Sequence, residues 1–143
     1  MIIPDLNLIV YAYNGGSSEH AAARKGWEGL MRGSTTVGLP WVVIVGFIRL
    51  TTTRNVFAQP CTVKDSLQCV ESWLAQPVVM PLNPGPRHFE SLKQAMGHTA
   101  GGALTTDAHL AALAIEFQAE LHSGDTDFAR FPGLRWKNPL AKP

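Results

Sequence analysis

The chain has 143 residues, 45% of them hydrophobic and 16% charged, with a formal net charge of +1. This length fits one compact domain, which we expect to span residues 1–143, with a core that needs no disulfide or structural metal. The near-neutral charge gives no sign of a broadly basic surface, so binding to nucleic acid would require a local positive charge or a bound cation.

We expect neither an export signal nor a membrane-spanning segment in this chain. Met1 is not followed by a basic stretch and a long apolar run. The apolar stretch at residues 39–50 is too short to span a bilayer. Cys61 and Cys69 have the spacing of neither a redox motif nor a zinc site. We therefore expect a soluble, cytoplasmic protein with free thiols and no membrane partner.

Short apolar segments alternate with longer helical patterns along the chain. The segments predict strands at residues 2–3, 35–39, 77–82, 120–123 and 134–136. The patterns between them predict helices at residues 7–13, 18–32, 41–50, 63–75, 86–97 and 107–118. Strands that alternate with helices predict a parallel sheet covered on both faces, and the last strand is expected at an edge.

Capping residues and composition refine three of these helices. Ser17 or Ser18 is expected to cap the second helix. Thr62 and Asp65 have the spacing of a capping box at the start of the fourth. The helix at residues 41–50 is apolar on nearly all sides, which predicts that it is buried.

Acidic residues fall where the predicted strands end. Asp5 ends the first strand, Asp125 and Asp127 follow the fourth, and Asp107 opens a helix. Ligands of a parallel α/β sheet bind beyond the carboxyl ends of its strands. Two carboxylates about 5 Å apart repel by roughly 3 kcal/mol at an effective dielectric near 20, so such a group favours a cation. Carboxylate oxygens suit Mg²⁺ or Mn²⁺, which can activate water and stabilise a reacting phosphate.

Each acid also has a purely structural interpretation. Asp107 alone is typical of a first helical turn, and Asp125 and Asp127 alone are typical of a turn or a cap. Asp5 is harder to explain in this way, because an unpaired carboxylate between an apolar strand and an apolar helix is costly to bury. The four residues taken together favour a functional site.

Several motifs resemble VapC-type PIN domains. Residues 3–12, IPDLNLIVYA, are similar to their start, where a strand ends in D-x-N. Residues 37–52, VGLPWVVIVGFIRLTT, are similar to their third helical region. Residues 106–114 and 123–128, TDAHLAALA and SGDTDF, resemble their paired acidic motifs, and residues 131–136, FPGLRW, match the usual ending. The order and spacing of these motifs carry the resemblance, which covers nearly the whole chain.

The resemblance implies a PIN-like three-layer α/β/α sandwich with a mainly parallel sheet of four to five short strands. It also implies a Mg²⁺-dependent endoribonuclease, with Mn²⁺ as a possible substitute, that cleaves cellular RNA as the toxin of a toxin–antitoxin pair. By that resemblance Asp5 and Asp107 are the main metal ligands, Asp127 and Asp125 complete the shell directly or through water, and Asn7 orients Asp5 or the bound water. The implied partners are the RNA substrate, a second copy of the chain and a small antitoxin protein.

One position departs from the family pattern. Many PIN domains place a glutamate in the helix at residues 41–50, and the corresponding position here is Gly46. The chain has no acidic residue between Glu28 and Asp65 that would replace it. Arg49 lies three residues beyond Gly46, on roughly the same helical face. This arginine is expected either to contact the acidic group or a phosphate, or to be a buried partner of one aspartate.

Two alternative functions follow from the same residues. The missing glutamate is compatible with a catalytically impaired PIN-like module that only binds protein. A small-molecule phosphohydrolase of another α/β family would need a second aspartate two residues after the nucleophile, but Asp5 is followed by Asn7 at that position.

Overall fold

The computed structural model describes residues 1–57 and 59–142. One parallel sheet of five strands, in the order β3-β2-β1-β4-β5, runs through the molecule. The strands are β1 (Ile2–Pro4), β2 (Val37–Pro40), β3 (Val79–Leu82), β4 (Glu120–His122) and β5 (Arg135–Lys137). The predicted parallel sheet is confirmed, with β5 at an edge as expected and β1 at the centre.

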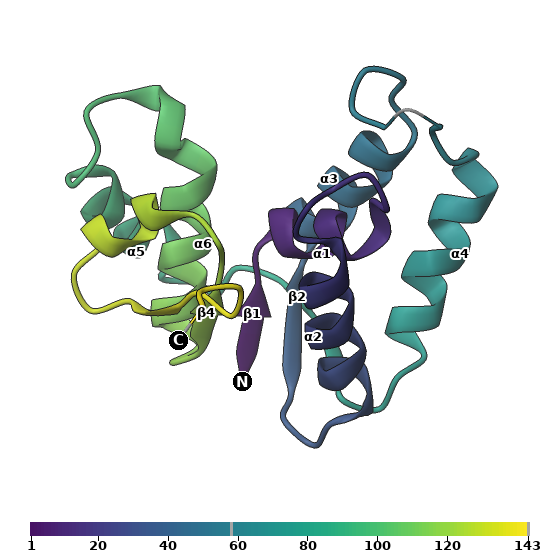
Figure 1. The fold of residues 1–143 in the computed structure, drawn as a ribbon. Helices are drawn as coiled ribbons and strands as arrows, with labels where there is room; N and C mark the ends of the chain where they lie inside the picture. The colour runs from purple at the N-terminus through teal and green to yellow at the C-terminus, as the bar shows by residue number, and fades with distance from the viewer. Residues whose placement is uncertain (58, 143) are drawn as a thin grey trace.

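Helices cover both faces of this sheet, as Figure 1 shows. The α-helices are α1 (Leu6–Tyr13), α2 (His20–Arg32), α3 (Trp41–Thr51), α4 (Val63–Leu74), α5 (His88–Met96) and α6 (Thr105–Glu116). The 3₁₀ turns are η1 (Gly102–Leu104) and η2 (Thr126–Arg130). Helices α5 and α6 lie together on one side of the sheet and α1 to α4 on the other, so the predicted α/β/α sandwich is confirmed. Among the described helices, none is long and apolar enough to cross a membrane.

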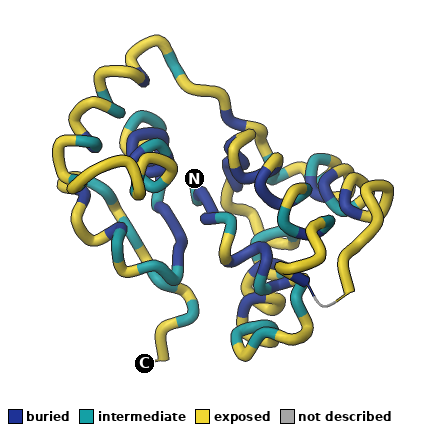
Figure 2. The backbone as a smooth tube through the Cα atoms, turned by 90° about the horizontal axis from the view of Figure 1, so that it is seen from above, coloured by how far each residue is buried: buried dark blue, intermediate teal, exposed yellow. Residues whose placement is uncertain are grey.

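The core follows the central strands. Ile3, Val37, Leu39 and Leu121 are all 0% exposed. Figure 2 shows the buried residues gathered along the strands and on the sides of the helices that face them. Strands covered on both faces have no outward polar side, which is why these segments are apolar without alternation.

Two predicted helix starts had different outcomes. The backbone N–H of Asp65 donates to the hydroxyl of Thr62 at 3.1 Å, which confirms that Thr62 caps α4. The start predicted for the second helix, at Ser17 or Ser18, is wrong because α2 begins only at His20. The Ser17 hydroxyl instead accepts the N–H of Glu19 at 3.1 Å and closes a turn that precedes the helix.

Helix α3 is buried on one side only. Ile44 and Phe47 are 1% exposed and pack into the core. Trp41 is 47% exposed, Val42 37% and Val45 59%, so the prediction of a helix buried on all sides is wrong. The reason is that α3 lies in the outer layer, where its neighbours α1 and α4 do not surround it.

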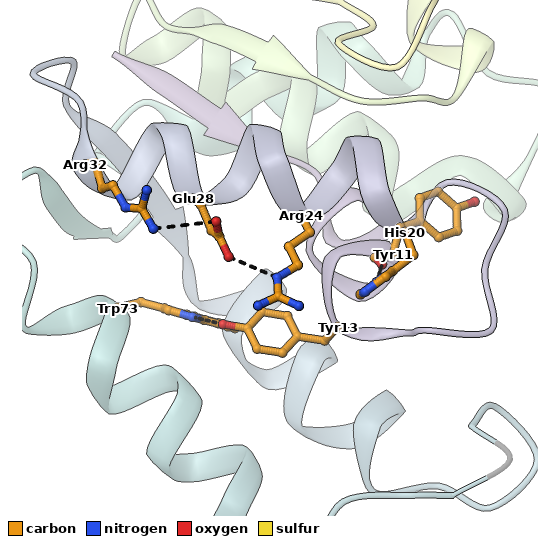
Figure 3. Close-up of polar contacts among 7 residues, drawn as sticks. All are labelled: Tyr11, Tyr13, His20, Arg24, Glu28, Arg32 and Trp73. Atoms are coloured by element: carbon orange, nitrogen blue, oxygen red, sulfur yellow. Dashed lines mark hydrogen bonds and ion pairs between the residues drawn. The ribbon is translucent and has the colours of Figure 1, made fainter.

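Hydrogen bonds and ion pairs support the layer formed by α1, α2 and α4. The Trp73 indole N–H donates to the Tyr13 hydroxyl at 2.8 Å and so joins α4 to α1 (Figure 3). On α2, Glu28 pairs with Arg24 at 2.9 Å and with Arg32 at 3.6 Å. The Trp73–Tyr13 bond ties the end of α1 to α4, whereas the Glu28 pairs lie within α2.

One edge strand contains a proline, and the other exposes two basic residues. Pro81 lies in β3 and has no N–H to donate. Arg135 and Lys137 are the exposed residues of β5.

Candidate metal centre

Asp5 is held at the carboxyl end of the central strand. Its backbone N–H donates to the carbonyl of His122, at the end of β4, at 2.8 Å. The side chain is 7% exposed, and the Ser123 hydroxyl donates to its Oδ2 at 2.7 Å. Burial raises the pKa of the Asp5 carboxyl, and the Ser123 hydrogen bond opposes that rise because it favours the charged form.

Ser123 joins the two strand ends that meet at this edge. Its hydroxyl donates to Asp5 and accepts the backbone N–H of Asp125 at 3.0 Å. The side chain is 0% exposed, so water does not compete for either bond. Ser123 was not predicted from the sequence as a site residue, although its place one step after β4 was visible there.

Three carboxylates form a group that we call the carboxylate cluster: Asp107, Asp125 and Asp127. One carboxylate oxygen from each lies within 4.8 Å of the others, and all three side chains are half-buried. Asp107 comes from the first turn of α6. Asp125 is the N-cap of η2 and accepts the N–H of Asp127 at 2.8 Å. The structure thus brings together three of the four predicted acids, and Asp5 lies beside them.

The charges of this group act most strongly on Asp107. Its pKa is raised to about 6, first by burial and then by the negative charges of Asp5, Asp125 and Asp127. Arg130 acts in the opposite direction and lowers it. A carboxyl group with a pKa of about 6 lies in surroundings that disfavour additional negative charge. The same surroundings favour a bound cation.

Arg130 is a site residue that the sequence analysis missed. Its guanidinium donates to Oδ1 of Asp127 at 3.0 Å and to the carbonyl of Asp127 at 3.2 Å. The pair spans a single turn of η2, and both side chains are partly exposed. Arg130 follows Asp127 by three residues, which is a spacing typical of an ion pair within a helix. This spacing indicates a pair only when the short helix η2 is known to form.

The other predicted residues lie around this group. Asn7 is exposed and lines, together with Asp125, a hollow of about 360 Å³. Arg49 is exposed, and within residues 1–57 and 59–142 it forms no ion pair, so its interpretation as a buried partner of an aspartate is wrong. Gly46 is buried, and a Cβ built there would lie 2.6 Å from Cδ2 of Leu6. Because Leu6 follows Asp5, this part of α3 does face the start of α1.

The donor set fits a hard divalent cation. It consists of carboxylate oxygens with no thiolate or imidazole among them, which is the set that suits Mg²⁺ and Mn²⁺. Half-burial leaves room for the water ligands that Mg²⁺ usually keeps. The residues present therefore fit such an ion, and Asp107, Asp125 and Asp127 are the ones placed to hold it.

Known proteins resemble this chain along most of its length. A family model described as "PIN domain" matches residues 2–134. Ribonuclease VapC33 of Mycobacterium tuberculosis is 43% identical over 143 residues, which cover 98% of this chain and 99% of that protein. VapC ribonuclease Mb2897 of Mycobacterium bovis is 43% identical over 141 residues, which cover 98% of this chain and 96% of that protein.

Solved structures share the fold. VapBC2 from Rickettsia felis, bound to a DNA fragment from its promoter, matches with a TM-score of 0.69 at 16% identity, over 96% of this chain and 98% of that chain. VapC20 of Mycobacterium tuberculosis, titled a Sarcin-Ricin loop cleaving toxin, matches with a TM-score of 0.69 at 18% identity, over 94% of this chain and 99% of that chain.

Replacing Asp107 by asparagine should stabilise the metal-free protein at neutral pH. Repulsion between carboxylates 4.8 Å apart is roughly 3 kcal/mol at an effective dielectric near 20, and exposure to solvent reduces it to about 1 kcal/mol. This corresponds to a rise in melting temperature of about 2–4 °C, measured by calorimetry in excess chelator at pH 7.

The pH dependence of this effect has a definite sign. The folded pKa of Asp107, about 6, lies above its ordinary value of 3.8, so the wild type loses stability as pH rises between these values. The gain from Asp107→Asn should therefore be absent at pH 4 and complete above pH ~6. Asp65→Asn, in the first turn of α4, is the matched control and should give no gain. An equal gain at pH 4 and pH 7 would contradict this explanation.

Proposed function

The chain belongs to the PIN-domain family, with VapC-type ribonucleases as its relatives, and from this premise we propose that it is a divalent-metal-dependent endoribonuclease that cleaves cellular RNA. The observation that carries the proposal is the carboxylate cluster, whose oxygens lie within 4.8 Å at the carboxyl edge of a parallel sheet. We also propose that residues 1–143 act as a single catalytic domain.

The proposal assigns a role to each of four acidic residues. Asp5 and Asp107 are the main ligands of the cation, Mg²⁺ or alternatively Mn²⁺, and Asp127 and Asp125 complete its shell directly or through water. When bound, such an ion neutralises the cluster, lowers the pKa of water and stabilises negative charge on a phosphate. The Ser123 hydroxyl fixes the position of the Asp5 carboxylate. Asn7 orients Asp5 or a water from the first turn of α1.

Positive charge beside the cluster supports an RNA substrate. Because the net charge of the chain is only +1, the positive charge that attracts a polyanion such as RNA has to be concentrated near the site. Arg130 supplies a guanidinium 3.0 Å from Asp127, at a partly exposed position. Guanidinium groups bind phosphate oxygens through two parallel hydrogen bonds, so Arg130 is suited to contact the RNA backbone. Arg49, which is exposed, is a second candidate for such a contact.

We further propose that the protein is a toxin that acts as a homodimer and is neutralised by a small antitoxin protein. Its relatives are named VapC ribonucleases, and several structures with the same fold are toxin–antitoxin complexes. The exposed apolar residues of α3, Trp41, Val42 and Val45, offer a surface that a partner would cover. The free thiols of Cys61 and Cys69 and an RNA substrate fit the cytoplasm.

Purified protein should cleave total cellular RNA in the presence of Mg²⁺ and lose that activity in excess chelator. Asp107→Asn should lower the rate at least about 100-fold, the scale seen when one electrostatic stabiliser is removed from an active site. Cleavage products are mapped by primer extension or sequencing, and circular dichroism verifies that the variant is folded.

The matched control for this loss of activity is Asp65→Asn, which changes an acid in the same position of a different helix and should leave cleavage unaltered. Full activity of folded Asp107→Asn, or of the wild type in excess chelator, would remove the proposal. A folded wild type that neither cleaves RNA nor binds Mg²⁺ or Mn²⁺ would instead favour the catalytically impaired, protein-binding module.

An acid introduced at Gly46 should strengthen metal binding if this position corresponds to the family's glutamate. The obstacle is Leu6, whose Cδ2 lies 2.6 Å from the site of the new Cβ, although the end of a leucine side chain can shift. We expect Gly46→Glu combined with Leu6→Ala to bind Mg²⁺ about tenfold more tightly than the wild type, about 1.4 kcal/mol. The substitution should not destabilise helix α3, because glycine in a helix interior is about 1 kcal/mol less favourable for helix formation than alanine.

Calorimetric titration of Mg²⁺ decides the question, with Gly46→Gln combined with Leu6→Ala as the uncharged control. The glutamate and glutamine variants have the same shape, so a difference between them measures the added carboxylate alone. If the folded glutamate variant binds Mg²⁺ no more tightly than the glutamine variant, Gly46 does not occupy the position of the family's glutamate.

The proposed assembly predicts a particle mass. Light scattering should give about twice the 15.5 kDa of one chain at high concentration, and Val45→Lys on the exposed face of α3 should reduce that mass towards one chain. Expression in bacteria should arrest growth, and the product of a neighbouring gene should relieve the arrest. A strict monomer would count against the dimer, and toxicity that no neighbouring product relieves would count against the antitoxin.

A further inference from the structure

A polar hollow of about 360 Å³ adjoins the carboxylate cluster and shares Asp125 with it. Its wall comes from two regions of the chain: α1 with the loop before α2, and the β4–η2 loop with the segment after β5. The residues of this wall that matter here are Asn7, Tyr11, Glu19, Asp125 and Asn138. All of them except Asn7 are half-buried, so much of the surface of these side chains is covered by the rest of the protein.

The wall combines one aromatic ring with hydrogen-bonding groups that are not used inside the protein. Tyr11 packs against the core, and its ring lies near His20 beside the loop between α1 and α2 (Figure 3). Asn138 accepts the N–H of Leu140 through Oδ1 at 2.9 Å, which leaves its amide N–H groups free. In the described part of the chain, the carboxylate of Glu19 has neither a hydrogen-bond nor an ion-pair partner.

The charge of the wall restricts what can enter. Glu19 and Asp125 are both acidic, so the hollow repels a phosphate but accepts a neutral group that presents N–H donors. Proteins that recognise single-stranded RNA stack unpaired bases on aromatic rings and bond to their Watson–Crick edges. One aromatic ring, two carboxamides and a free carboxylate are groups of this kind.

We propose that this hollow binds one unpaired nucleobase next to the phosphate that is cleaved, and that guanine is the preferred base. The inference rests on the proposed ribonuclease function. Because Asp125 belongs to both the hollow and the cluster, a base held in the hollow belongs to a nucleotide adjoining the reacting phosphate. Tyr11 provides the stacking surface, Glu19 reads the base, and Asn138 and Asn7 complete the hydrogen bonds.

The preference for guanine follows from the arrangement of donors on the bases. Guanine presents two neighbouring N–H groups, at N1 and N2, on its Watson–Crick edge, and a single carboxylate can accept both. Adenine and cytosine each present one amino group beside an unprotonated ring nitrogen, which would face the carboxylate lone pairs. Uracil presents one N–H between two carbonyl oxygens. Only guanine therefore gives Glu19 two hydrogen bonds without a repulsive contact.

The direct test measures binding of the four nucleosides by NMR titration in excess chelator, where no cleavage occurs. Guanosine should shift the Tyr11 ring signals at lower concentration than the other three. Glu19→Gln should weaken guanosine binding at least about fivefold, the lower limit for one bidentate contact to a base. Glu71→Gln, which changes an exposed glutamate of α4, is the matched control and should have no effect.

The stacking surface is tested separately. Tyr11→Phe keeps the ring and should retain guanosine binding, whereas Tyr11→Leu keeps an apolar side chain without a flat face and should weaken binding of all four nucleosides. In RNA cleavage with Mg²⁺, wild-type cut sites should be enriched in a flanking guanine, and Glu19→Gln should reduce that enrichment while cleavage persists.

The outcomes separate this inference from the function on which it rests. Nucleoside binding without preference for guanosine, or guanosine binding unchanged in folded Glu19→Gln, would overturn the base site. RNA cleavage with no nucleoside binding and no flanking preference would overturn the base site and leave the ribonuclease function intact. Guanosine binding that depends on Glu19 in a protein that cleaves no RNA would support the site and refute the function.

Discussion

Repulsion among the carboxylates of Asp107, Asp125 and Asp127 is the constraint on which the rest of the site depends. A fold selected only for stability would keep these groups apart, because each added charge within 4.8 Å raises the cost of the others. Here the surrounding groups instead hold them together: the Asp127 N–H bonds Asp125, and Arg130 pairs with Asp127. The pKa of Asp107 is raised first by burial and then by the negative charges of Asp5, Asp125 and Asp127, which these contacts do not fully compensate.

The parallel sheet makes this concentration of charge possible. Strands β1 and β4 are neighbours at its centre, so the residues that follow them emerge at the same edge. Ser123 then joins the two chain segments, since its hydroxyl bonds both the Asp5 carboxylate and the Asp125 N–H. Ile3 and Leu121 at the middle of these strands are 0% exposed, and their close packing leaves the acids little freedom to move apart. The same edge also carries the neighbouring hollow, which shares Asp125 with the carboxylate cluster, so the proposed cation and base sites would lie side by side.

Much of this arrangement was predictable from the sequence, and the exceptions share a cause. The apolar segments located every strand. The strand ends located Asp5, Asp125 and Asp127, and a helix start located Asp107, because these features depend on local pattern and on a general property of parallel sheets. Arg130 was missed because its pairing depends on the tight turn of η2, and Ser123 because a serine after a strand is common. The exposed face of α3 was missed because composition alone does not tell a helix in the core from one in an outer layer. The equivalence of Gly46 to the family's glutamate still rests on the resemblance alone.

The edges of the sheet limit how copies of this protein can associate. An unpaired edge strand is a template for strand addition and aggregation unless its hydrogen-bonding pattern is interrupted or charged. Pro81 interrupts the pattern in β3, and the exposed Arg135 and Lys137 would place like charges face to face if two β5 edges met. Continuous intermolecular sheets are disfavoured at both ends. The proposed association with a second copy or an antitoxin would therefore use helical surfaces, and contacts between helices can separate without unravelling the fold.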